Sequence, residues 1–372
     1  MTVDILWRQI PIREAELSLT KVLRCGQTFR WKNINNVWSF AIHDRVVLLK
    51  QDEEYLHYSH LMKESLTTQK STAESEKQTL EFVKDYFNLS VNLVDLYDHW
   101  SSQHEPFKKS KLTPFEQFKG IRILRQDPWE TVVSFICSSN NNVKRISKMC
   151  DSLCSEFGDY INEHDGVQYH SFPSAEKLAS SSKIETRLRE LGFGYRAKYI
   201  YQTAVKFVDN KGFPDITIEK LNSLRNEEYE LSHNFLLQLT GVGPKVADCI
   251  CLMALDKHDC VPVDTHVYQI AVRDYKFKGK KDMKTMNKVT YDAIRLFFKD
   301  LFGEYAGWAQ SVLFASDLGD LNNGTNRIED TEVKKEEVDV KKEKVQENRR
   351  KLTTTSTNRV TKRAKTLVKV GA

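Results

Sequence analysis

Residues 236–247 read Leu-Leu-Gln-Leu-Thr-Gly-Val-Gly-Pro-Lys-Val-Ala, and this stretch decides the fold expected for the chain. An apolar helix ends before two glycines that flank a single valine, and Pro244 opens a second helix at the first-turn position that proline favours. Glycine lets the backbone turn sharply and leaves its amides uncovered. The stretch therefore predicts two helices joined by a tight hairpin.

Such a hairpin can hold a DNA phosphate. The amides beside Gly241 and Gly243 are accessible, and the N-terminus of the following helix adds partial positive charge. This arrangement is the helix-hairpin-helix pattern, which grips a DNA backbone without reading its sequence, so both glycines are expected DNA contacts. An ordinary helix–helix turn with a glycine cap would use the same residues and is the alternative.

Two side chains near the hairpin could carry chemistry. Lys245 lies in the first helical turn, where the helix dipole and partial burial disfavour the ammonium, so we expect a lowered pKa and a nucleophilic amine. A lysine that only contacts phosphate would look the same. Nineteen residues later, Asp264 precedes an apolar-periodic helix and is typical of an N-cap. If hairpin and cap face one cleft, its carboxylate could stabilise a sugar cation and move protons for Lys245.

These residues resemble a known family. The sequence Leu-x-Gly-Val-Gly-Pro-Lys245 followed by Val-Pro-Val-Asp264-x-His266 is similar to the helix-hairpin-helix DNA glycosylases, and more closely to the eukaryotic 8-oxoguanine DNA glycosylase/AP lyases. Five further stretches carry the closer resemblance, in family order between about residue 5 and residue 318: Cys25-Gly-Gln-Thr-Phe-Arg-Trp31, Phe135-Ile-Cys-Ser-Ser-Asn-Asn-Asn142, Leu191-Gly-Phe-Gly-Tyr-Arg-Ala197, Lys245-Val-Ala-Asp-Cys-Ile-Cys-Leu-Met253 and Tyr305-Ala-Gly-Trp-Ala-Gln-Ser-Val-Leu-Phe314.

The resemblance implies a bifunctional enzyme. Lys245 would attack the anomeric carbon of a flipped nucleotide, expel 8-oxoguanine that was paired with cytosine and form a Schiff base, with Asp264 assisting. Elimination at the β position would then nick the strand. A cationic imine is an electron sink, which is why an amine nucleophile permits strand cleavage and a water nucleophile does not.

The resemblance also implies a site for the base. The carbonyl of Gly26 would accept from the N7–H that only the oxidised base carries, whereas guanine would leave two acceptors facing each other at a cost of about 1–3 kcal/mol. Gln310 would read the Watson–Crick edge, and Phe314, one helical turn on, would stack on the base, with Cys249 and Met253 on its other side. Periodicity alone favours core packing for Phe314, Cys249 and Met253, a surface position for Gln310 and a turn at Gly26.

A third set of residues would contact the DNA around the flipped nucleotide. By resemblance, Asn140 fills the gap that the base leaves, Arg145 and Arg196 read the orphaned cytosine, and Tyr195 wedges the stack. His266, in a first helical turn, could donate to a phosphate. The alternatives are a capping turn for Asn140 and an ordinary surface position for His266.

Composition and periodicity set the fold class. A chain of 372 residues, 40% hydrophobic and 29% charged, with seven cysteines, suits a soluble protein with an ample core and reduced thiols. Short β-branched runs at 38–42, 45–50 and 54–58 predict an antiparallel meander, followed by a polar loop at 60–78. Helices are expected at 129–138, 143–157, 174–191, 196–209, 227–239, 244–255, 265–274, 286–302 and 305–317. We therefore expect an α+β protein, mostly α, with an N-terminal antiparallel β domain at 1–112 and a helix-hairpin-helix glycosylase core at 113–319.

The remaining residues, 320–372, are expected to form a charged, disordered tail. They carry fourteen basic and nine acidic side chains, a surplus that equals the net charge of +5, so residues 1–319 are neutral. A neutral body gives no global sign of nucleic-acid binding, and such binding must come from a local site. Arg350-Lys351 and Lys362-Arg-Ala-Lys365, ten residues apart, have the spacing of a bipartite nuclear import signal, although a solvated basic tail has the same composition.

No cofactor is expected to be required. Endonuclease III and adenine glycosylases carry four cysteines for an iron–sulfur cluster after the catalytic helices, whereas this chain has no cysteine after Cys260, and no metal site is expected. The expected partner is damaged double-stranded DNA with 8-oxoguanine paired with cytosine. The protein is expected to be a monomer and to bind no membrane. Its expected location is the nucleus, and a mitochondrial pool stays an open alternative. A glycosylase of the same superfamily for another damaged purine is one alternative. A non-catalytic DNA-binding module, which would need neither Lys245 nor Asp264, is another.

Overall fold

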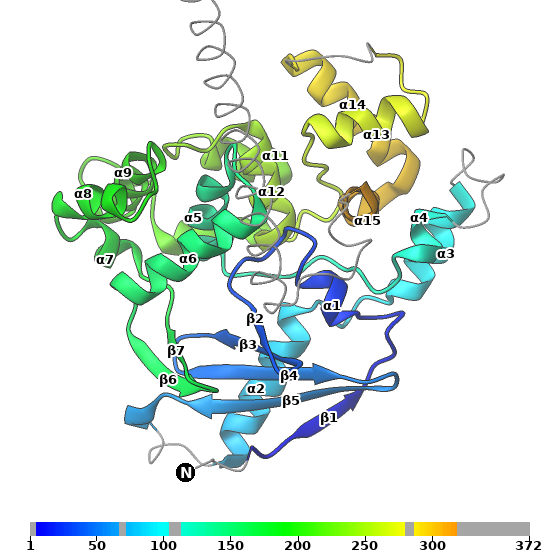
Figure 1. Ribbon diagram of the computed structural model, residues 1–372. Helices are drawn as coiled ribbons and strands as arrows, with labels where there is room; N and C mark the ends of the chain where they lie inside the picture. Colours follow the sequence, from blue (N-terminus) through cyan, green and yellow to red (C-terminus); the bar gives the residue numbers. More distant parts are fainter. Residues whose placement is uncertain (1–4, 67–71, 104–112, 280–285, 318–372) are drawn as a thin grey trace, which may run out of the picture. The chain divides into compact units, whose positions relative to one another are not determined.

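The computed structural model of the protein describes residues 5–66, 72–103, 113–279 and 286–317 (Figure 1). The tail expected at 320–372, with its basic import-type sequence, lies outside the described residues. The described chain up to Asp317 belongs to one compact unit. No helix in these ranges is long and apolar enough to cross a membrane.

The N-terminal part is built on an antiparallel sheet of five strands in the order β1-β5-β4-β3-β2 (Figure 1). The strands are β1 (Arg8–Pro11), β2 (Lys32–Ile34), β3 (Val37–Ala41), β4 (Arg45–Gln51) and β5 (Tyr55–Met62). The predicted meander is β3-β4-β5, and its register places Val47 opposite both Phe40 and His60. The polar loop predicted at 60–78 is wrong at both ends, because β5 continues to Met62 and helix α2 (Thr72–Tyr86) begins inside it.

Both faces of β4 are buried, which explains its unbroken run of apolar residues. Val47 and Leu49 pack toward α2, whereas Val46 and Leu48 pack with Ile161 and other residues of a small hairpin. The hairpin is formed by β6 (Tyr160–His164) and β7 (Val167–His170). A strand with period-two side chains thus joins two layers, one on each side of the sheet.

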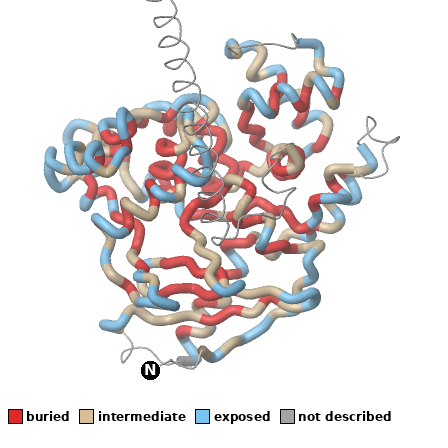
Figure 2. Tube along the Cα trace, viewed as in Figure 1, coloured by how far each residue is buried: buried red, intermediate tan, exposed pale blue. Residues whose placement is uncertain are grey.

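The rest of the chain is mostly helical, as predicted from residue 113 onward. Its helices are α4 (Pro114–Gln117), α5 (Pro128–Ser138), α6 (Val143–Phe157), α7 (Ala175–Ala179), α8 (Lys183–Glu190), α9 (Arg196–Val208), α10 (Ile218–Ser223), η3 (Leu224–Asn226), α11 (Tyr229–Leu236), α12 (Pro244–Ala254), α13 (Thr265–Asp274), α14 (Lys288–Phe302), η4 (Gly303–Tyr305) and α15 (Ala306–Asp317). Three shorter or unpredicted elements precede them in the chain: α1 (Leu19–Val22), η1 (Glu64–Leu66) and α3 (Leu93–Gln103). Figure 2 shows the buried residues gathered along the facing sides of these helices and through the sheet.

The fold is therefore α+β and mostly α, with an N-terminal antiparallel sheet followed by a helix-hairpin-helix core. Two predictions within the helical part are wrong. The helix expected at 174–191 is divided into α7 and α8, because Ser180 and Ser181 bond the backbone of Lys177 and Lys183 instead of continuing the helix. The β6–β7 hairpin was not expected in this region. All seven cysteines are buried and free.

Candidate active site

The hairpin between α11 and α12 needs glycine at its first position. Gly241 has φ +86°, and a Cβ there would lie 2.6 Å from Cδ2 of Tyr199, so both the backbone and the packing exclude a side chain. Gly243 is different, because its φ is −94° and a Cβ would meet nothing within 4 Å. Gly243 is the N-cap of α12 and Pro244 follows it, so the first amides of α12 have no side-chain cap.

Lys245, in the first turn of α12, is held as an ammonium. Its pKa is raised by the sulfur of Cys249 and by the carboxylate of Asp264, which together outweigh burial. Burial raises the pKa of the Cys249 thiol to about 11, and the nearby Lys245 ammonium opposes that rise. The prediction of a lowered Lys245 pKa is therefore wrong, because the interactions with Cys249 and Asp264 outweigh the lowering by burial.

Asp264 is the N-cap of α13, as its sequence context predicts. Its side chain accepts from the backbone amide of Val267 at 3.0 Å. The same carboxylate acts on Lys245 through space, so capping and an electrostatic effect on the amine are not alternatives. One carboxylate therefore belongs to both the helix start and the site around the amine.

Gly26 and Phe314 meet although they lie at opposite ends of the described chain. Gly26 has φ +87°, and a Cβ there would lie 3.9 Å from Cε1 of Phe314 and 3.8 Å from Cγ2 of Val143. The ring of Phe314 is partly exposed and meets the ring of His266 edge-on, with centroids 5.9 Å apart. Nδ1 of His266 in turn lies 3.3 Å from Oδ2 of Asp317. A partly exposed phenyl ring and a glycine without a side chain are therefore neighbours.

Three further predicted residues line up on α12 and α15. Cys249 and Met253 are buried on successive turns of α12 after Lys245. Gln310, on α15, is 5% exposed and belongs to the buried polar residues. The two helices pack closely, because a Cβ on Gly307 of α15 would lie 2.6 Å from Cδ1 of Leu252 on α12. The side-chain amide of Gln310 can both donate to and accept from a ligand.

The residues expected to contact the opposite strand gather around the turn before α6. Asn140 is exposed and has φ +48°, a conformation that asparagine tolerates better than most residues. Arg196 donates to the carbonyls of Ser139 and Asn140, and the hydroxyl of Tyr195 donates to Ser139 at 3.0 Å. The guanidinium of Arg196 is buried below the Tyr195 ring, 4.5 Å from its centroid.

Arg145 lies on the same side of this turn but is exposed. Its Nη2 donates to the carbonyl of Gly192 at 3.2 Å, in the loop that also carries Tyr195. The Tyr195 ring meets that of Tyr199, with centroids 5.6 Å apart, and Tyr199 packs on Gly241 of the hairpin. Hairpin, loop and turn are therefore joined by direct contacts, and Val143 continues them to Gly26.

A buried carboxylate that the sequence did not reveal lies on the same helix as Lys245. Asp248, on α12 between Lys245 and Cys249, is completely buried and accepts from the hydroxyls of Tyr229 at 2.7 Å and of Tyr291. Arg295 lies 3.6 Å from its Oδ2. The Tyr291 hydroxyl also accepts from the amide of Val263, one residue before Asp264. A charged residue inside the apolar run 246–254 was the available signal.

The described residues contain no group of three or more His, Cys, Asp or Glu side chains placed to hold a metal ion. The chemical groups gathered here are an amine, a carboxylate and a thiol, with main-chain amides at the start of α12. An amine beside a carboxylate can form and break a bond to carbon, and helix-start amides can hold an anion.

Known proteins share this organisation. A family model for the N-terminal domain of 8-oxoguanine DNA glycosylases matches residues 9–132, and one for HhH-GPD superfamily base excision DNA repair proteins matches residues 133–291. The N-glycosylase/DNA lyase of Saccharomyces cerevisiae is 40% identical over 350 residues, which cover 85% of this chain and 88% of the relative. An N-glycosylase/DNA lyase of Arabidopsis thaliana is 36% identical over 316 residues, covering 84% of this chain and 80% of the relative.

A solved structure is similar over nearly its whole length. It is the 8-oxoguanine glycosylase/lyase of Clostridium acetobutylicum in complex with double-stranded DNA that contains cytosine opposite 8-oxoguanine. It is 26% identical, with a TM-score of 0.65, and the match covers 84% of this chain and 96% of that one. With the hairpin and the lysine that follows it, these likenesses establish that the chain belongs to the eukaryotic 8-oxoguanine DNA glycosylase/AP lyase family, as a DNA-binding repair enzyme with both N-glycosylase and lyase activity.

Proposed function

We propose that this glycosylase/lyase removes 8-oxoguanine paired with cytosine, taking the flipped nucleotide into the space beside Gly26, Phe314 and the start of α12. The observation that carries the proposal is the approach of Gly26 to Phe314, because it brings a main-chain turn and an aromatic ring together from distant parts of the sequence. Lys245 lies on the adjoining helix with Cys249 one turn behind it. A glycosylase for another purine would have no use for the Gly26 carbonyl.

Recognition of the base uses hydrogen bonds that guanine cannot make. The carbonyl of Gly26 accepts from N7–H of the oxidised base, and the side-chain amide of Gln310 meets its Watson–Crick edge. Phe314 stacks on one side of the base, and Cys249 and Met253 cover the other side. Guanine presents a lone pair at N7, so the Gly26 carbonyl would remain buried against another acceptor.

The chemistry begins with the loss of a proton from Lys245, because the free protein holds the ammonium. Nζ then bonds to C1′, the bond from C1′ to N9 breaks, and the base leaves with that electron pair and takes up a proton. The sugar ring opens to an imine. A proton leaves C2′, and the bond from C3′ to the phosphate oxygen breaks, which cuts the strand. Asp264 stabilises the positive sugar and assists the proton transfers.

The strand with cytosine is read by the cluster around Ser139. Asn140 enters the gap left by the flipped base, Tyr195 wedges between base steps, and Arg145 and Arg196 donate to the orphaned cytosine. Amides at Gly241 and Gly243 and the ring of His266 hold phosphates. The left-handed turn at Asn140 and its bonds to Arg196 support this reading, since they hold an exposed amide at the molecular surface.

Borohydride trapping tests substrate, nucleophile and intermediate together. A duplex with 8-oxoguanine opposite cytosine should give a covalent adduct with the native enzyme, and none with undamaged DNA or the Lys245→Gln variant. Lys77→Gln, an exposed lysine on α2, is the matched control and should trap normally. Release of 8-oxoguanine by Lys245→Gln would contradict the nucleophile assignment, and release of alkylated purines in preference to 8-oxoguanine would contradict the substrate.

The proposal extends to the setting in which the enzyme works. The imine route needs an amine and no cofactor, so EDTA should leave the activity unchanged. The protein is proposed to act as a monomer, and the sedimentation of its complex with DNA checks this.

The protein is also proposed to enter the nucleus through the basic sequence at 350–365. Replacing the basic residues of that sequence should abolish nuclear accumulation of the full chain, and an unchanged distribution would contradict the import role.

A further inference from the structure

We propose that Gln27 and Gln126 are positioning residues for base recognition, because their buried amides fix the Gly26 turn to the end of the catalytic helix α12. This inference rests on the proposed role of Gly26. The residues lie 99 positions apart in the sequence and belong to different parts of the fold. We call residues 122–126 the strap; this segment ends with Gln126 and contains the two residues that the Gln27 side chain binds.

Gln27 joins the Gly26 turn to the strap. Its side chain is 2% exposed, with Nε2 donating to the carbonyl of Arg122 at 2.9 Å and Oε1 accepting from the amide of Leu124 at 3.0 Å. These two bonds match a donor to a carbonyl and an acceptor to an amide, so they fix the orientation of the side-chain amide. The side chain of Gln27, the residue that follows Gly26, is therefore fixed to the strap.

Gln126 binds the main chain of Gln27 and connects it to α12. The side-chain Nε2 of Gln126 donates to the carbonyl of Gln27 at 2.8 Å. The backbone amide of Gln126 donates to the carbonyl of Met253 at 3.0 Å, in the last turn of α12. Arg225 closes the connection, donating to the carbonyls of Gln126 and Ala254 at 2.8 Å each.

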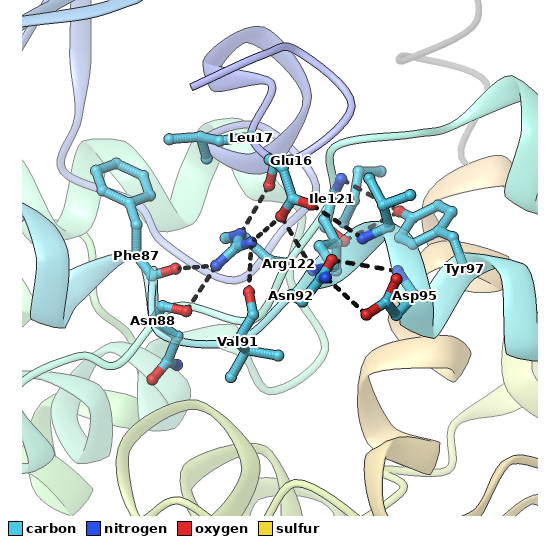
Figure 3. Close-up of polar contacts among 12 residues, drawn as sticks. Glu16, Leu17, Phe87, Asn88, Val91, Asn92, Asp95, Tyr97, Ile121 and Arg122 are labelled. Atoms are coloured by element: carbon cyan, nitrogen blue, oxygen red, sulfur yellow. Dashed lines mark hydrogen bonds and ion pairs between the residues drawn. The ribbon is translucent and has the colours of Figure 1, made fainter. Parts of the chain in front are cut away.

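The other end of the strap is anchored to the N-terminal part by Arg122, which is 1% exposed. Figure 3 shows its guanidinium directed at main-chain carbonyls of Phe87, Asn88 and Val91, with distances of 3.0, 2.6 and 3.1 Å. It also donates to the carbonyl of Glu16 at 2.8 Å and pairs with the Glu16 carboxylate at 3.0 Å. The strap therefore cannot shift without breaking several buried bonds.

A rigid strap matters because a glycine does little to fix its own backbone conformation. Glycine at φ +87° can move to other conformations at little cost, so the direction of its carbonyl must be fixed by its neighbours. A recognition hydrogen bond tolerates errors of only about 0.5 Å and 10–20°. Gln27 and Gln126 set the Gly26 carbonyl at a defined distance from the helix that carries Lys245 and Cys249.

Two activities of the enzyme separate this role from a merely structural one. Excision of 8-oxoguanine needs both the Gly26 carbonyl and Lys245, whereas cleavage at a preformed abasic site needs Lys245 without a base to recognise. Gln126→Met and Gln27→Met keep similar volume and remove the bridging bonds. We expect single-turnover excision of 8-oxoguanine opposite cytosine to fall about tenfold or more, with abasic-site cleavage and trapping within about twofold of the native enzyme.

Asn162→Leu is the matched control. Its amide bonds the carbonyl of Met62 at 2.7 Å, so the variant loses a similar side chain-to-backbone bond in the β6–β7 hairpin and should keep both activities. Equal losses of excision and abasic cleavage in both glutamine variants would overturn the proposal. Should one variant fail to fold, the other decides, since each breaks a different side of the bridge. A native enzyme that cleaves abasic sites and ignores 8-oxoguanine would overturn the proposed function before any variant is made.

Discussion

Asp264 makes two interactions with one carboxylate, and the asparagine variant separates them. Asparagine caps a helix about as well as aspartate, so α13 should keep its start. The negative charge that helps to raise the Lys245 pKa is lost. Because Lys245 is a base, removing a nearby anion lowers its pKa, and the neutral amine should appear at lower pH.

The measurement for Asp264→Asn is kcat/KM for 8-oxoguanine release as a function of pH, which reports groups of the free enzyme. In the native enzyme kcat/KM should keep rising as pH increases toward the raised Lys245 pKa. In the variant this rise should begin at lower pH, with a lower maximum because the sugar cation loses its partner. If the rise in kcat/KM begins at the same pH in the variant and in the native enzyme, Asp264 does not control the protonation of Lys245.

Phe314 is expected to supply stacking energy to the flipped base. Phe314→Ala should weaken binding of the Lys245→Gln protein to 8-oxoguanine duplex by about 1–3 kcal/mol, the usual loss for an aromatic platform. Binding to undamaged duplex should change little, because no base is then flipped onto the ring. Leu231→Ala, at an exposed apolar residue on α11, is the control for loss of surface hydrophobicity. Equal losses on both duplexes would exclude the stacking role.

At the residue scale, sequence reasoning works where chemistry is local. The cap at Asp264 and the hairpin glycine at Gly241 follow from neighbouring residues and are confirmed. The predicted direction of the Lys245 pKa shift is wrong because Cys249 and Asp264 raise this pKa. Asp264 comes close to Lys245 only through the fold, so the local sequence does not reveal the interaction. Asp248 was overlooked for the same reason, since its partners come from α11 and α14.

The hairpin offers a pair of glycines that differ in backbone conformation and in surroundings. Gly241→Ala meets both a left-handed backbone and the Tyr199 ring at 2.6 Å, so it should lower the free energy of unfolding by about 1–3 kcal/mol. Gly243→Ala has an ordinary φ and free space, so the fold should keep its stability.

Both glycine variants should nevertheless lose affinity for DNA. In Gly243→Ala the methyl group lies at the start of α12, where a phosphate approaches the amides, while in Gly241→Ala the hairpin itself is displaced. Urea denaturation and fluorescence anisotropy with an undamaged duplex check the two effects separately. Full DNA affinity in a stably folded Gly243→Ala protein would argue against phosphate binding at this helix start.

At the element scale, the predictions succeed for long, strongly periodic segments. The start and end of α13 agree with the predicted 265–274, and α5 differs from 129–138 by one residue. The β6–β7 hairpin was missed although Asp165 and Gly166 form an Asp-Gly turn with φ of +50° and +73°. Such a dipeptide is a strong hairpin signal, and it went unread because the strands beside it are short and polar.

Asp248 connects elements across the helical part, so its loss should be felt by the whole molecule. Asp248→Asn removes the negative partner of Arg295. It also weakens the hydrogen bonds that the Tyr229 and Tyr291 hydroxyls donate to Asp248. We expect the free energy of unfolding to fall by about 3 kcal/mol, at the lower end for a broken buried pair because Arg295 is partly exposed. Asp300→Asn, exposed on the same helix α14 as Arg295, is the control for urea denaturation. A loss equal to that of the control would mean that the buried charge does not stabilise the fold.

For the whole molecule, the order of motifs along the chain predicts the fold and most of the site. Gly26, Lys245 and Phe314 were assigned to one site from family resemblance, and the structure brings Gly26 and Phe314 within contact distance. The strap could not be predicted in this way. The bond from Gln126 to Gln27 depends on how two distant segments align, and neither glutamine differs in local sequence from a surface residue.

Burial of the cysteines has a consequence for the conditions under which this enzyme works. All seven thiols are buried, and burial raises the pKa to about 11 for Cys25 and Cys249 and to about 12 for Cys154. Peroxides attack the thiolate, which Cys25, Cys249 and Cys154 scarcely populate near neutral pH. The oxidants that damage guanine therefore react slowly with these thiols, including the one beside Lys245, on the protein proposed to remove that damage.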